Sequence, residues 1–256
     1  MHLSGRAALC VCLVWFGMAG PAWSARTEVE VRVLARGAKF LGGYSAPVRV
    51  VLTDADTGET LAQGNTSGTT GDTRTIMDAS ASDGGKRSTA GSAVFRAALD
   101  IERPRRVMVS VTGPLSQPQA ISTATSTQWI LPGRHVTAGD GWVLELPGLI
   151  VDLASPTAYQ WINAGTTVPL RASVTMLCGC AISEHGPWRA DQTEVEAHVT
   201  IDGDVSHRYP LRFDAERSLF GADIPTDKPG LYELEIRAWM GASNNAGVAS
   251  TAFFVH

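Results

Sequence analysis

The feature that most constrains the fold of this chain is the alternation of apolar and polar residues with a period of two. Val29, Val31 and Val33 alternate with charged residues, and the same pattern returns between Val195 and Ile201. Successive residues of a strand point to opposite faces of a sheet, so this pattern predicts strands with one buried and one solvated face. No helical period of useful length follows the N-terminal segment. We therefore expect an all-β protein of two tandem antiparallel β-sandwiches.

Residues 25–113 are expected to form the first sandwich. Strands are predicted from residue 28, at 48–52, from residue 61, at 94–99 and at 106–112. Residues 64–91 interrupt them with a stretch rich in Gly, Ser, Thr and Asp, which predicts a long, mobile loop with a short strand at 74–77. The order of short strands over residues 27–112 resembles the prealbumin-like and carboxypeptidase-regulatory sandwiches of exported proteins.

Residues 149–256 predict the second sandwich, and residues 114–148 are interpreted as a connector. Strands are expected from residue 149 and at 167–176, 194–201, 207–213, 219–224, 230–240 and 248–255. The run from Pro229 to Ile236 resembles the penultimate strand of immunoglobulin-like and fibronectin-III-like domains, with Tyr232 placed as in a tyrosine corner. The resemblance implies a fold and no function.

The N-terminal segment has the parts of a secretory signal peptide. A short positive region precedes an apolar run at 7–19, and Ala22-Trp23-Ser24 has the small-x-small pattern of a cleavage site. Cleavage between Ser24 and Ala25 removes residues 1–24 and leaves an exported protein, periplasmic or secreted. The apolar run is too short to span a membrane, and no later segment is long and apolar enough, so we expect no transmembrane segment.

Charge and motifs narrow the function classes. The formal net charge of -4 argues against a nucleic-acid partner, because such proteins usually present a basic stripe. The chain has no Gly-x-Ser-x-Gly, no His-Glu-x-x-His, no P-loop and no dinucleotide-binding glycine pattern. The sequence therefore favours a non-enzymatic protein without deciding the point.

The candidate site lies around Cys178 and Cys180, the cysteines that remain after cleavage. If the strand that precedes them continues, Met176, Cys178 and Cys180 share one face, because alternate residues of a strand do. His185 follows in a loop. Two thiolates with a thioether and an imidazole suit Cu(I), and also Zn²⁺. The first hypothesis is thus an exported accessory protein that binds a soft metal, above all Cu(I), through these four residues.

Two other hypotheses stay open. In the second, Cys178 and Cys180 form an inert disulfide in a structural or protein-interaction module. Alternate strand residues have Cα atoms about 6.5 Å apart, near the upper end of the disulfide range, so closure requires a bend at Gly179. The third is thiol–disulfide exchange, which requires an accessible thiol of low pKa.

The connector suggests contacts between the sandwiches. Trp129, His135 and Trp142 lie in this otherwise polar segment, and we expect the tryptophans to wedge between the two sandwiches. The partner that the sequence implies is an unidentified protein of the exported compartment.

Overall fold

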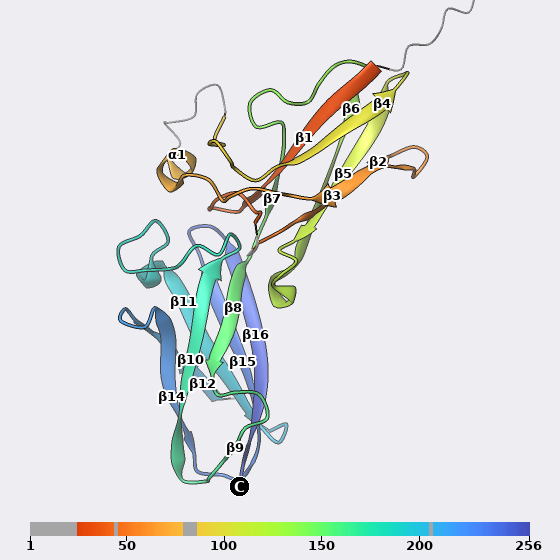
Figure 1. The fold of residues 1–256 in the computed structure, drawn as a ribbon. Helices are drawn as coiled ribbons and strands as arrows, with labels where there is room; N and C mark the ends of the chain where they lie inside the picture. The colour runs from red at the N-terminus through yellow and green to blue at the C-terminus, as the bar shows by residue number, and fades with distance from the viewer. Residues whose placement is uncertain (1–24, 44–45, 79–85, 205–206) are drawn as a thin grey trace, which may run out of the picture.

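The computed structural model describes residues 25–43, 46–78, 86–204 and 207–256. The predicted signal peptide, with its cleavage position at Ser24, lies outside the described residues. Within those ranges, no helix combines the length and the apolar character needed to cross a membrane. Two β-sandwiches lie end to end, with the start of β1 (Ala25–Ala35) and the end of β16 (Asn245–Val255) at opposite ends of the molecule (Figure 1).

The first sandwich consists, among the described residues, of two sheets ordered β4-β1-β7 and β3-β2-β5-β6. Its other strands are β2 (Arg49–Asp54), β3 (Thr60–Asn65), β4 (Phe95–Ile101), β5 (Arg105–Gly113), β6 (Ser122–Ile130) and β7 (Trp142–Leu146). Alternate side chains, among them Val31, Val50 and Val109, are fully buried in the core. β1 and β7 run parallel, whereas the expectation was a purely antiparallel sandwich.

Residues 114–148 belong to the first sandwich, in contrast to the predicted connector. β6 pairs with β5 from Arg105↔Ile130 to Gly113↔Ser122, and β7 pairs with β1. The 3-10 helix η2 (Pro118–Ala120) precedes β6. Between Leu146, which ends β7, and Leu149, which begins β8, only Pro147 and Gly148 link the two sandwiches.

The Gly- and Ser-rich stretch 64–91 contains a helix where the sequence predicted a strand. The helix α1 (Thr73–Met77) is a little over one turn long, and the Asp72 side chain caps it by accepting a hydrogen bond from Thr75 N at 2.9 Å. An N-cap side chain satisfies an amide that has no partner inside the helix. The prediction of a strand at 74–77 was therefore wrong.

Asp140 fixes the end of this stretch on the first sandwich. Its side chain accepts hydrogen bonds from Arg87 N at 2.7 Å and Ser88 N at 3.0 Å, and its carbonyl oxygen accepts one from Arg32 Nη1 at 3.0 Å. Burial raises the pKa of the Asp140 carboxyl, but the hydrogen bonds from Ser88 and Arg87 and the charge of Arg32 together hold it below its ordinary value. The carboxylate therefore remains charged while it binds the loop.

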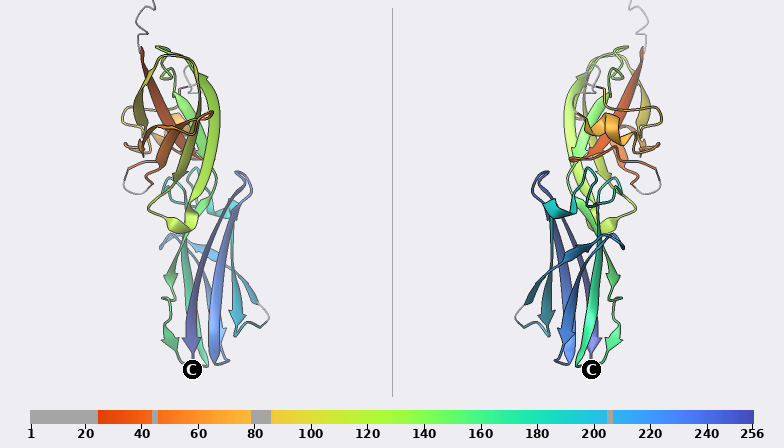
Figure 2. Two further views of the ribbon diagram at one scale, coloured as in Figure 1. Left: turned by 90° about the vertical axis from the view of Figure 1, so that its right-hand side faces the viewer. Right: turned by 90° about the vertical axis from the view of Figure 1, so that its left-hand side faces the viewer.

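The second sandwich consists of a four-stranded sheet, β13-β14-β10-β8, and a five-stranded sheet, β12-β11-β15-β16-β9, within the described residues (Figure 2). Its other strands are β8 (Leu149–Ser155), β9 (Trp161–Ile162), β10 (Thr166–Met176), β11 (Thr193–Ile201), β12 (His207–Pro210), β13 (Arg212–Asp214), β14 (Leu219–Thr226) and β15 (Gly230–Met240), and η3 (Ala190–Gln192) precedes β11. The predicted strand 207–213 is split at Leu211, where the chain passes from one sheet to the other.

Tyr232 forms the expected corner. Its ring is buried, stacks on Phe253 with 5.0 Å between ring centroids, and its hydroxyl donates to Lys228 O at 2.9 Å. A buried tyrosine hydroxyl needs such a partner. This contact confirms the tyrosine corner that the sequence pattern suggested.

Candidate functional site

Cys178 and Cys180 are joined in a disulfide at the end of β10. Their Cα atoms are 5.4 Å apart, closer than alternate residues of a straight strand. Gly179 between them has a φ of +74°, which glycine adopts without steric cost. Met176 N donates to Cys180 O at 3.0 Å, and Gly179 N donates to Met176 O at 2.8 Å. The chain therefore reverses direction in a tight turn, which we call the Cys-Gly-Cys turn.

The four candidate metal ligands have different environments. Met176 is fully buried and pairs with Leu149 of β8. Cys178 is 3% exposed, whereas the His185 side chain is 93% exposed. The Nε2 atom of His185 lies 4.0 Å from Oε2 of Glu184. Nowhere in the described chain do three or more His, Cys, Asp or Glu side chains gather as a metal site would require. The structure thus places Met176 beside the bonded cysteines and does not bring His185 to them.

The loop that follows the Cys-Gly-Cys turn contacts the first sandwich. Thr175 forms an isolated bridge with Ala181, and Ser183 N donates to Trp188 O at 3.0 Å, so the loop folds back on itself. The Trp188 indole is buried, and its Nε1 donates to Gly37 O at 2.9 Å. The turn therefore presents Trp188 to the neighbouring sandwich.

Asn245 also makes polar contacts between the sandwiches, as does Gln119 of η2, whose Nε2 donates to Asp152 Oδ1 at 2.6 Å. The Asn245 side chain is fully buried; Oδ1 accepts from Gly148 N at 2.9 Å, and Nδ2 donates to Arg36 O at 2.9 Å. A Cβ added to Gly247 would lie 2.5 Å from Leu149 O, so this glycine allows the close approach of β16 to β8. Trp188 and Asn245 together form what we call the joint.

Apolar packing continues through the joint. Leu177, which precedes the Cys-Gly-Cys turn, is fully buried, and its side chain lies against Gly148 in the link. Leu146 and Leu149 on either side of the link belong to one continuous cluster of buried side chains that includes residues of both sandwiches. The joint is therefore an extension of the core.

The residues predicted to contact the second sandwich lie elsewhere. Trp129 is 62% exposed on β6. Trp142 is buried in the first sandwich, where its indole donates to Ser126 Oγ at 3.3 Å. His135 Nδ1 accepts from Glu28 N at 3.0 Å. The sequence contains no signal for Asn245 as a joint residue, because it lies in a run, Asn244-Asn245-Ala246-Gly247, that is typical of a hairpin turn.

A groove of about 660 Å³ lies on the outer face of the five-stranded sheet, over β11, β15 and β16. In this face Glu233 stands between Thr200 and Ala252. Tyr159 N donates to Ala252 O at 2.7 Å, so Tyr159 occupies the next position of the same row. Two strand spacings, about 10 Å, separate the backbones at Glu233 and Tyr159. The small side chain of Ala252 leaves the space between them open. We call this feature the sheet groove.

Aromatic rings extend the wall of the sheet groove. Tyr159 is 68% exposed and lies 6.2 Å from Phe254 between ring centroids. Trp161 stacks on Phe254 at 4.6 Å and is nevertheless 65% exposed, so one face of its indole is open to solvent. Tyr159 has a φ of +56°, a conformation uncommon for residues other than glycine and often found at functional sites.

Charged groups in and beside the sheet groove pair with one another. His198 Nε2 lies 2.7 Å from Glu196 Oε1 and 3.2 Å from Arg237 Nη1, and Arg237 Nε donates to Glu235 at 2.6 Å. The hydrogen bond with His198 holds the pKa of the Glu196 carboxyl below its ordinary value, against the effect of burial. By contrast, the Glu233 side chain makes no hydrogen bond or ion pair with any residue in the described ranges.

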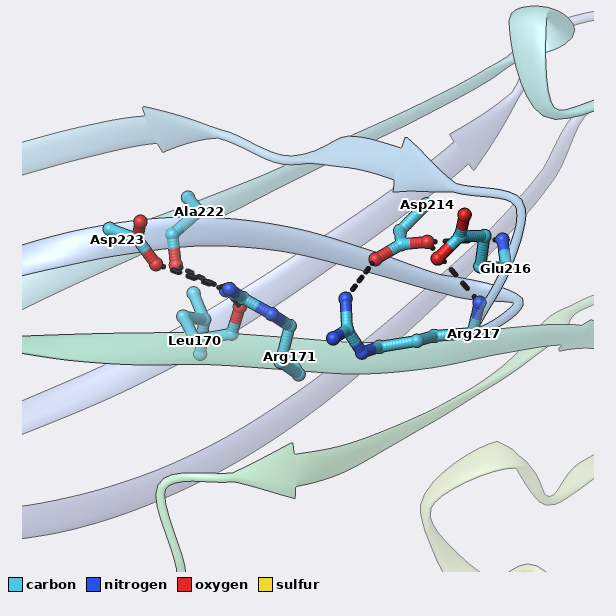
Figure 3. A network of polar contacts seen from close by, with 7 residues as sticks. All are labelled: Leu170, Arg171, Asp214, Glu216, Arg217, Ala222 and Asp223. Carbon is cyan, nitrogen blue, oxygen red and sulfur yellow. Dashed lines mark hydrogen bonds and ion pairs between the residues drawn. The ribbon is translucent and has the colours of Figure 1, made fainter.

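Two arginines on the opposite face of the second sandwich are paired with neighbouring groups. Arg171 of β10 donates to Ala222 O at 3.0 Å and to Asp223 Oδ1 at 3.2 Å, and Arg217 Nη1 donates to Asp214 Oδ2 at 2.7 Å (Figure 3). These contacts join neighbouring strands and the β13–β14 hairpin.

Comparisons with known proteins yield similar folds only. No family model matches the chain, and neither does any curated protein. The fibronectin(III)-like modules of CbhA from Clostridium thermocellum are 12% identical over 89% of this chain and 90% of theirs, with a TM-score of 0.28. The titin domains Z1Z2, solved in complex with telethonin, are 15% identical over 90% of this chain and 93% of theirs, with a TM-score of 0.26.

An engineered protein is 17% identical to this chain, with a TM-score of 0.32. The match covers 50% of this chain and 24% of that protein. The similar structures include fibronectin-III-like and immunoglobulin-like sandwiches, the families that the C-terminal half resembles in sequence. At these TM-scores they add no argument, and the fold is defined by the strand pairing itself.

Proposed function

We propose that the chain is an exported, non-enzymatic binding module whose two β-sandwiches act as one rigid body. The observation that carries this proposal is the joint. The link is two residues long, and the buried side chains of Trp188 and Asn245 each bond to the backbone across it. Domains that move independently usually share small, polar interfaces, whereas this core is continuous.

In this proposal the Cys178–Cys180 disulfide is structural. It closes the turn that directs Leu177 and the Trp188 loop toward the first sandwich, and Cys178 is almost fully buried. Such a bond is maintained in an oxidising compartment, which supports export. Soft-metal binding and thiol exchange both need at least one free thiolate. Protein purified from the exported fraction is therefore expected to have no free thiols and no bound copper; two free thiols with copper would favour the Cu(I) hypothesis instead.

The binding function is tested by site-specific photocrosslinking in the exported fraction. A photoreactive residue at Ser250, in the sheet groove, is expected to form adducts, whereas the same residue at Asp100, exposed on β4 of the first sandwich, is not. Adducts at Ser250 that do not exceed those at Asp100 would contradict a binding role for this face.

A further inference from the structure

We infer that the sheet groove binds a neutral oligosaccharide chain. This inference rests on the proposed binding function and names the ligand class at that surface. The volume of about 660 Å³ falls within the range of about 300–1,000 Å³ that is typical of ligand pockets. The unpaired polar groups, the aromatic rings and the balance of charge each restrict the ligand.

The polar groups in the sheet groove match a polyol. The hydroxyls of Thr200 and Ser250 and the carboxylate of Glu233 form no hydrogen bonds within the described chain, although all three line the groove. A hydroxyl donates and accepts, and a carboxylate accepts at two oxygens. Sugar hydroxyls, which also donate and accept, satisfy both kinds of group at once.

The aromatic rings match the apolar faces of sugar rings. Tyr159 forms the wall of the groove, and the Trp161 indole continues that wall through its contact with Phe254. Each ring offers a flat apolar surface together with a polar atom at its edge, as a ring at a wet binding surface requires. The gap over Ala252 leaves space for a sugar ring between Tyr159 and Glu233.

Charge separates a neutral glycan from other ligands. An anion would meet the uncompensated carboxylate of Glu233. A polycationic peptide would find only this one free negative charge, because Glu235 is already paired with Arg237. An apolar segment would leave the hydroxyls and the carboxylate buried without partners, which is unfavourable. A neutral chain of hydroxyl groups avoids these conflicts.

The test is affinity electrophoresis of the mature protein in gels that contain soluble neutral polysaccharides: a β-glucan, a xylan, a galactomannan and glycol chitin. The expected result is retardation by at least one of them. Trp161→Ala and Tyr159→Gly are each expected to weaken that binding at least ten-fold. Glycine suits the positive φ at position 159, so this variant removes the ring without straining the backbone.

Trp129→Ala, which removes an equally exposed tryptophan from the first sandwich, is the matched control and should bind as the wild type does. Glu233→Gln should weaken binding and not abolish it, because the amide still accepts hydrogen bonds. Retardation by none of the four polysaccharides, or equal retardation of the two aromatic variants and the wild type, overturns the inference. So does binding of an oligolysine peptide that Glu233→Gln abolishes.

The photocrosslinking experiment keeps the two proposals separate. Protein adducts at Ser250 together with no retardation by any polysaccharide would overturn the glycan inference and leave the binding function standing. Absence of both adducts and retardation would overturn both.

Discussion

Asp54, at the end of β2, shows how a single carboxylate organises a turn. Its Oδ1 accepts hydrogen bonds from Asp56 N and Thr57 N, both at 2.9 Å, and its Oδ2 accepts one from Arg105 Nη1 at 3.0 Å. The amide of Thr57 contributes most to holding the pKa of Asp54 below its ordinary value, and the Asp56 amide and Arg105 add to this effect. The folded state therefore favours the charged carboxylate.

The sign of the resulting pH dependence follows from linkage. A carboxyl whose pKa is lowered by folding stabilises the protein above its unfolded pKa, about 3.9 for Asp, and this stabilisation is lost as the pH falls through the folded pKa. Asp54→Asn keeps an oxygen acceptor and removes the charge. Its loss of stability relative to the wild type should be constant between about pH 5 and 8 and shrink below about pH 4.

Urea unfolding at a series of pH values measures this difference. Asp100→Asn, an exposed aspartate whose side chain makes no hydrogen bond within the described residues, is the control and should follow the wild type. A difference for Asp54→Asn that does not change with pH would show that its charge has no role in stability.

At the Cys-Gly-Cys turn the structure has the disulfide of the second hypothesis, whereas the first hypothesis required two free thiolates. The disulfide closes a ring of three residues, so the entropy it removes from the unfolded chain is small, corresponding to about 1.6 kcal/mol. The double variant Cys178→Ala and Cys180→Ala should remain folded and lose about 1–3 kcal/mol, because a buried sulfur is also removed.

Thermal unfolding with and without a reductant measures this loss. Reduction should destabilise the wild type and leave the double variant unchanged. A wild type whose stability does not respond to a reductant that fully reduces the disulfide would contradict a structural role for the bond.

Strands with regular apolar alternation could be predicted from the sequence, and elements without it could not. Apart from the buried Ile130, the side chains of β6 that face inward are only half-buried and mostly small or polar, so Ser122–Ile130 lacks the pattern. The four residues assigned to a strand at 74–77 are too few to separate a period of 2 from one of 3.6. Asp72 and Thr75, which cap α1, were the better signal.

The candidate site was only partly predictable for a similar reason. The Cys-Gly-Cys turn is local, so its bend at Gly179 follows from the spacing. The joint and the sheet groove depend on which strands become neighbours. Trp188 and Gly37 are 151 positions apart, and Tyr159 reaches the groove because its loop pairs with β16 near Ala252. A single sequence gives no measure of such distant pairings.

We expect the joint to make the two sandwiches unfold as one thermodynamic unit. Asn245→Ala removes the partner of Gly148 N and of Arg36 O in a buried site, and should cost about 2–3 kcal/mol. Calorimetry should show one transition for the wild type and two for the variant, and X-ray scattering should show a wider range of shapes for the variant. Trp129→Phe, on the exposed face of β6, should change neither measurement.

Two separate transitions in the wild type would contradict this prediction. So would a variant that is as cooperative and as compact as the wild type, because the joint would then be only a contact.

The parallel pairing of β1 with β7 determines how the molecule responds to a pulling force. β1 begins at the far end of the first sandwich, and β7 ends at the link, with Val31↔Trp142 to Ala35↔Leu146 in register between them. Tension applied at the two ends would pull β1 and β7 in opposite directions along their length. The hydrogen bonds of this pair would then be loaded in shear and have to break together, so the first sandwich should resist extension better than one whose strands can be peeled apart bond by bond.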